Sequence, residues 1–74
     1  MNTRNWISEV FSAHADLLEF HNRNHDEEEA AADITRATVI RGVLSSKFGE
    51  ALAQEGYADF LRDIDSRKSW RAPA

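Results

Sequence analysis

The chain of 74 residues contains one proline, at position 73, and three glycines, at positions 42, 49 and 56. Proline and glycine interrupt regular structure more than other residues do, so long stretches of this chain can stay helical. Apolar and polar residues rarely alternate one by one, which argues against β-strands. Together these features predict an all-α fold.

A first helix is expected from about residue 4 to about residue 22. Its apolar residues recur at spacings of four and three, which places them along one side of a helix. The main stripe is Trp6, Val10, Ala13, Leu17 and Phe20, and it is widened by Ile7, Phe11 and Leu18. Asn22 and Asn24 should end this helix, because asparagine side chains compete with backbone hydrogen bonding and favour caps and turns.

A second helix is expected to begin near residue 25. Four consecutive acids at 26–29 stand where the positive end of the helix dipole favours negative charge. Its apolar stripe consists of Ile34, Ala37, Ile40, Leu44 and Phe48. Both Gly49 and Gly56 are possible helix ends, and we favour Gly56 because Ala51 and Leu52 would extend the stripe.

A shorter third helix is then expected at about 57–67. The predicted architecture is a helical hairpin of two long antiparallel helices, with the shorter C-terminal helix packed across it. We expect a single helical domain over residues 1–68 and a mobile C-terminal tail over 69–74.

The second helix carries small or apolar residues around most of its circumference, which is typical of a helix surrounded by neighbours. One side is a stripe of small residues that would let another backbone approach closely: Ala31, Thr35, Thr38, Gly42 and Ser45. Another side presents Val39 and Val43. A core of this size without disulfides is marginal, and association often stabilises such cores. We therefore expect a homodimer that packs through one of these two sides.

The charge balance favours a protein partner. The net charge is −4, from nine basic and thirteen acidic residues, whereas affinity for nucleic acid usually depends on neutralising phosphates. The apolar runs are too short to span a membrane, and the absence of cysteine fits a reducing compartment, so we expect a cytoplasmic protein. We see neither a phosphate-binding loop nor a nucleophile elbow, and we expect no catalysis and no cofactor.

We accordingly predict a small acidic, non-catalytic regulator or inhibitor that binds another protein through helical surfaces. The acids could meet a basic surface on that partner. The expected contact residues are Asp26, Glu27, Glu28, Glu29, Val39 and Val43.

Two alternatives stay open. The first is a DNA-binding transcriptional regulator that uses the helix at 34–48, which contains Arg36 and Lys47 and no acid. The second is a small metal-binding helical protein, because His21 and His25 have the spacing of two ligands on one helix face. This second alternative requires the helix to continue through the turn signals at 22–24.

Overall fold

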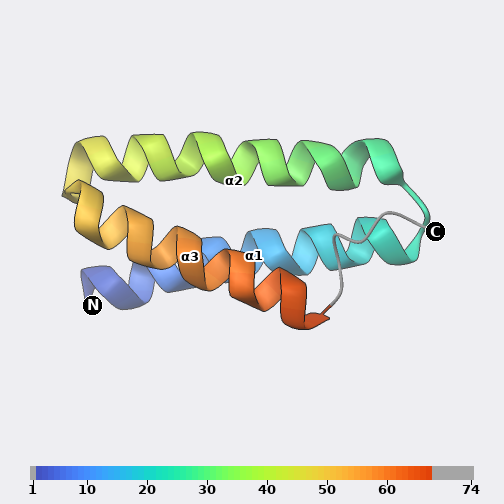
Figure 1. The fold of residues 1–74 in the computed structure, drawn as a ribbon, viewed down its shortest axis with the longest axis horizontal. Coiled ribbons are helices and arrows are strands. Elements are labelled where there is room, and N and C mark those ends of the chain that lie inside the picture. Colours follow the sequence, from blue (N-terminus) through green and yellow to red (C-terminus); the bar gives the residue numbers. More distant parts are fainter. Residues whose placement is uncertain (1, 68–74) are drawn as a thin grey trace.

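Three α-helices make up residues 2–67, the part of the chain that the computed structural model describes (Figure 1). α1 spans Thr3–Arg23, α2 spans Glu27–Phe48 and α3 spans Glu50–Arg67. The all-α class is therefore confirmed. The helices contain 21, 22 and 18 residues, so the third is close in length to the other two. The predicted tail at 69–74 lies outside the described residues.

The connection between α1 and α2 forms where the asparagines and acids predict it. The Asn24 side chain donates a hydrogen bond to the Phe20 carbonyl at 2.8 Å and closes α1. His25 then adopts a φ of 59°, in the left-handed region, and reverses the chain. The Asp26 carboxylate accepts a hydrogen bond from the Glu29 backbone N–H at 3.2 Å and caps α2. The first turn of α2 is acidic, as expected.

The expected continuation of the second helix to Gly56 is wrong. α2 ends at Phe48, and Gly49 has a φ of 97°, which a glycine adopts without a steric penalty. The Gly49 N–H still donates to the Ser45 carbonyl at 3.0 Å, so the last turn of α2 is satisfied before the chain turns. Ala51 and Leu52, which seemed to extend the stripe of α2, belong to the first turns of α3.

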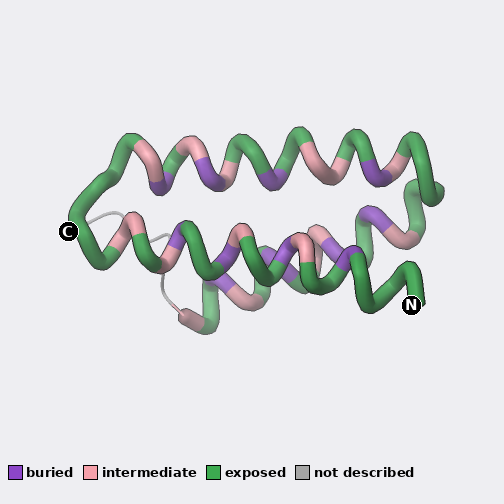
Figure 2. The backbone as a smooth tube through the Cα atoms, turned by 180° about the vertical axis from the view of Figure 1, so that it is seen from behind, coloured by how far each residue is buried: buried purple, intermediate pink, exposed green. Residues whose placement is uncertain are grey.

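The three helices enclose one core. α2 runs back along α1, since Trp6 contacts Phe48 at one end of the pair and His21 contacts Asp33 at the other. Buried positions on each helix face the space between the helices (Figure 2). The buried apolar residues are Ile7, Phe11, Ala15, Leu18, Ala30, Ala37, Leu44, Ala53, Phe60 and Ile64.

α3 packs closely on α1 at Gly56. A Cβ atom at this position would lie 2.6 Å from Cγ2 of Ile7 and 3.0 Å from two ring carbons of Phe11. Because Gly56 has no side chain, the backbone of α3 can pack directly against α1. The close approach expected at Gly42 is not seen within residues 2–67, because a Cβ there would meet no atom within 4 Å.

An arginine joins the end of α3 to α1. Arg67 donates to the Asp63 carboxylate at 2.8 Å and to the Asp16 carboxylate, across the helix pair, at 2.6 Å. The hydrogen bonds that Arg67 donates to Asp63 and then to Asp16 raise the pKa of Arg67 above its ordinary value.

Alanine substitutions at the two helical glycines should act in opposite directions. At Gly56 the new methyl would overlap Ile7, whose β-branched side chain has few alternative rotamers. Overpacking costs about 1–3 kcal/mol and alanine gains about 1 kcal/mol in a helix, so Gly56→Ala should lose about 1 kcal/mol of stability. At the open position, Gly42→Ala should gain roughly 0.5–1 kcal/mol. Urea unfolding measures both changes, and equal effects would contradict the close approach at Gly56.

Candidate protein-binding surface

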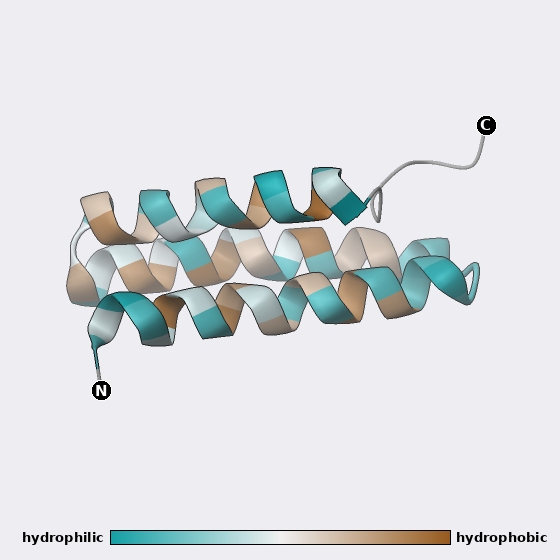
Figure 3. Cartoon of the chain, turned by 90° about the horizontal axis from the view of Figure 1, so that it is seen from below, coloured by the Kyte–Doolittle hydropathy of each residue, from teal (hydrophilic) through white to brown (hydrophobic). Residues whose placement is uncertain are grey.

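The fold buries one part of the apolar stripe predicted for α1 and leaves the other part exposed. Ile7, Phe11 and Leu18, expected at its margin, are buried in the core. Trp6, Leu17 and Phe20, expected at its centre, are 40%, 46% and 60% exposed. The prediction missed the rotation of α1 that brings its core side toward Gly56 of α3. Apolar segments recur along the length of α1 (Figure 3).

The exposed apolar residues of α1 lie on the side of that helix that borders α2. His14 lines a hollow with α2 residues, and His21 is hydrogen bonded to α2. Leu17 lies three positions after His14 and four before His21, so it shares their side of the helix. Phe20 packs edge-on against the His21 ring, with centroids 5.5 Å apart.

The second helix contributes its own exposed apolar residues to this side. Val39 and Val43 are 60% and 51% exposed. Val39 and the half-buried Ile40 line an open hollow of about 280 Å³ with His14 of α1. We call the exposed and half-buried apolar residues on this side of α1 and α2 the apolar face: Trp6, Val10, Leu17 and Phe20 of α1 with Val39, Ile40 and Val43 of α2.

A buried carboxylate lies at the end of this surface near the α1–α2 connection. Asp33 is 0% exposed. Its Oδ2 is 2.6 Å from Nδ1 of His21, and its Oδ1 accepts a hydrogen bond from Arg36 at 2.9 Å. Arg36 also contacts Glu29 at 3.3 Å, and the hydrogen bonds to Asp33 and then Glu29 raise the pKa of Arg36. Both oxygens of the buried group are therefore satisfied by partners from α1 and α2.

Sequence reasoning missed Asp33, although the signal was present. Ala30, Asp33, Ala37 and Leu44 are the buried positions of α2, and they recur at spacings of three, four and seven. The aspartate therefore stands within a buried stripe rather than on a polar face. A charged residue in such a stripe indicates a partner on a neighbouring helix.

The two histidines of the metal hypothesis do not share a helix face. α1 ends at Arg23, before His25, and the positive φ of His25 turns it away from the helical path. His21 instead uses Nδ1 in its contact with Asp33. Within residues 2–67, no three or more His, Asp or Glu side chains are grouped as metal ligands would be. The geometry of the described residues thus lends the metal hypothesis no support.

The four acids predicted as a docking site form an exposed corner, but two of them are engaged within the chain. Asp26 caps α2, and Glu29 contacts Arg36. Glu27 and Glu28 are exposed and carry most of the negative charge that a partner would meet.

The small-residue stripe of α2 is largely exposed. Within it, Thr38 Oγ1 is 3.2 Å from the Tyr57 hydroxyl of α3. Ala31, Thr35 and Gly42 are exposed, and Ser45 is half-buried. This stripe offers much less apolar surface than the side of Val39 and Val43.

Two of the three basic residues of the predicted DNA-reading helix are engaged within the chain. Arg36 is held by Asp33 and Glu29. Arg41 lies over the Tyr57 ring of α3, 5.3 Å from its centroid. Only Lys47 projects from α2 without such a contact among the described residues. These contacts leave Arg36 and Arg41 less available to a phosphate backbone.

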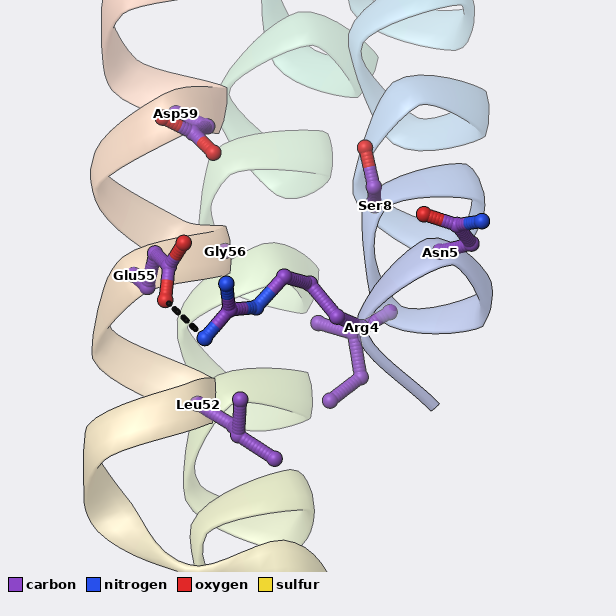
Figure 4. A pocket seen from close by; sticks show the side chains of 8 residues that line it. Arg4, Asn5, Ser8, Leu52, Glu55, Gly56 and Asp59 are labelled. Carbon is purple, nitrogen blue, oxygen red and sulfur yellow. Dashed lines mark ion pairs between the residues drawn. The ribbon is translucent and has the colours of Figure 1, made fainter. Parts of the chain in front are cut away.

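A second hollow, of about 210 Å³, lies between α1 and α3 (Figure 4). Ile7 and Gly56 are among its lining residues, and an ion pair of 3.3 Å between Arg4 and Glu55 crosses it. Ser8 and Asp59 line it, but neither a histidine nor a lysine does. Its residues provide no evident nucleophile with a general base beside it.

Comparison of the chain with protein-family models, with curated proteins and with solved structures found no match. None of the three described helices is long and apolar enough to cross a membrane. The chain's own geometry is therefore the basis for a functional proposal.

Replacing His21 by leucine should lower the free energy of unfolding by about 2 kcal/mol, because the buried Asp33 carboxylate then loses one of its hydrogen-bonding partners. Adding Asp33→Leu to the same chain should recover most of this loss, since the polar pair is removed as a unit. Urea unfolding followed by circular dichroism measures both variants. His25→Asn is the matched control and should change little, because asparagine tolerates the left-handed backbone of this position. If His21→Leu matched the control, the contact would not contribute to stability.

Proposed function

We propose that the chain is a non-catalytic regulator or inhibitor that acts by binding protein through its apolar face, and that it works as a homodimer. The observation that carries this proposal is the distribution of large apolar side chains. Among the described residues seven of them are at least 39% exposed, and five of the seven belong to the apolar face: Trp6, Leu17, Phe20, Val39 and Val43. Single exposed apolar residues are ordinary, but a contiguous group marks an interaction surface.

The composition of the apolar face resembles the centre of a protein interface. Trp6 and Phe20 are aromatic, and aromatic side chains are enriched where interfaces exclude water. Arg36 stands at its edge with part of its guanidinium in solvent, and arginine is also enriched in such surfaces. The face thus combines large apolar side chains with a polar side chain at its edge.

The shape of the surface suits a helical partner. α1 and α2 lie side by side in opposite directions, which leaves a shallow groove between two parallel ridges. Helices pack by placing such ridges into grooves at interaxial distances of about 8–10 Å. The exposed acids Glu27 and Glu28, at the connection between the same two helices, would favour a partner with basic groups near that end.

Charged substitutions on the apolar face should abolish binding without unfolding the chain. Val39→Glu and Val43→Glu place a carboxylate at exposed positions of α2, so the core is unaffected but a dry interface would have to bury an unpaired charge. Leu61→Glu is the matched control, because Leu61 is 43% exposed on α3, off the face.

The measurement is cross-linking of the tagged chain in extracts of its source cells, with mass spectrometry of the products. Wild type and Leu61→Glu should recover the same protein, either another copy of the chain or a different one, and the two valine variants should lose it. Recovery of the same products by all four chains would refute the proposal.

A further inference from the structure

We infer that residues 68–74, which follow α3, dock on α1 of the same chain and cover Phe20, at the end of the apolar face near the α1–α2 connection. This inference deepens the proposed function and rests on it, because the segment occupies part of the same face until a partner displaces it. The segment reads KSWRAPA, and Trp70 is its one large apolar residue. The position where α3 ends, the length of the segment and the charge at this end of the bundle support the inference.

α3 ends beside the exposed part of α1. Arg67, the last residue of α3, donates a hydrogen bond to the Asp16 carboxylate at 2.6 Å and lies 3.8 Å from the Glu19 carboxylate. Phe20 directly follows Glu19 and stands four residues after Asp16, so it neighbours the carboxylate that holds Arg67. The segment therefore begins within about one helical turn of Phe20.

The segment is long enough to bring an aromatic side chain onto this site. Trp70 is three residues after Arg67. An extended chain spans about 3.3 Å per residue, so its Cα can lie up to about 10 Å from that of Arg67. The ring of Phe20 is 60% exposed even though it packs edge-on against His21. An indole placed on Phe20 and on the neighbouring Leu17 would remove both from water and form an aromatic pair.

The charge at this end of the bundle is opposite to that of the segment. Residues 16–28 carry five acids and one cation: Asp16, Glu19, Asp26, Glu27 and Glu28 with Arg23. Three of these acids are engaged by Arg67, by Arg23 or as the cap of α2. Glu27 and Glu28 are exposed and make no ion pair with another described residue. Lys68 and Arg71 stand on either side of Trp70, and the segment contains no acidic side chain, so its charge is complementary to these two carboxylates.

The segment would act as a competitor for the apolar face. A partner that uses Phe20 has to displace Trp70 first, and this requirement lowers its apparent affinity. Val39 and Val43, on α2, are not among the residues covered in this way. A partner anchored on the two valines could therefore bind first and release the segment afterwards.

The test is quenching of Trp70 fluorescence by acrylamide in the purified full chain at low salt. Trp6→Phe removes the only other tryptophan and keeps an aromatic ring against Phe48. Trp70 should be quenched much less than N-acetyltryptophanamide, and Phe20→Ala should abolish most of this protection. Phe48→Ala is the matched control, because it removes an exposed phenylalanine at the opposite end of the α1–α2 pair, and it should leave the quenching of Trp70 unchanged.

Charge reversal gives a second measurement that does not alter the apolar contact. Glu27→Lys combined with Glu28→Lys should also expose Trp70 to acrylamide, and adding Lys68→Glu and Arg71→Glu should restore its protection. Glu9→Lys with Glu50→Lys makes the same change in net charge at exposed positions outside the connection, and it should have no effect. Restoration by the four-fold variant also shows that the first pair of changes does not act by unfolding the chain.

A wild-type Trp70 quenched as freely as N-acetyltryptophanamide, or protection that survives Phe20→Ala, would overturn the docking. Protection that appears only as the chain concentration rises would place Trp70 on another molecule and would overturn docking within one chain. The cross-linking experiment tests the proposed function separately, because it depends on Val39 and Val43. If the valine variants lose their partner while Trp70 is unprotected, the proposed function stands without this regulation. If Trp70 is protected while all chains recover the same products, the docking stands but does not regulate a partner.

Discussion

The contact between Gly56 of α3 and the side chains of Ile7 and Phe11 determines how α1 is rotated in the bundle. Because α3 approaches closely at this point, the side of α1 that it covers becomes the core side. Trp6, Leu17 and Phe20 are then left outside. A larger residue at position 56 would force α3 away and remove the reason for this rotation. The core and the exposed apolar face thus have a single steric origin.

A polar contact, rather than apolar packing, aligns α1 with α2. Two of the four buried residues of α2 are alanines, whose small side chains specify a register less strongly than large ones do. Asp33 removes this freedom, because its carboxylate is fully buried and is satisfied only where His21 stands opposite it. Buried polar groups that fix a register are well known in helical assemblies, at some expense of stability. Here the contact also sets the height at which residues of α1 face those of α2.

The helices were predictable, whereas the choice among their faces was not. Caps and breakers act over a few residues, so Asn24 and the acids after it correctly indicated the turn between α1 and α2. Gly49 and Gly56 were alternative ends for the second helix. The choice between them depended on a contact with α1, which lies far away in the sequence. The exposed face was missed for the same reason. Periodicity shows that α1 is apolar over a wide arc, but only packing decides which part of the arc is covered.

The very short connections between the helices have a consequence for how the chain folds. Three residues separate α1 from α2, and Gly49 alone separates α2 from α3. Neighbouring helices can therefore meet after closing only small loops, which is the topology of chains that fold within microseconds to milliseconds. The contact between α1 and α3 is different, because Asp16 and Arg67 are 51 residues apart. Closing so long a stretch of chain costs entropy, so Gly56 packs on α1 late in folding. Pairs of helices form first, and the bundle is complete when the third helix docks.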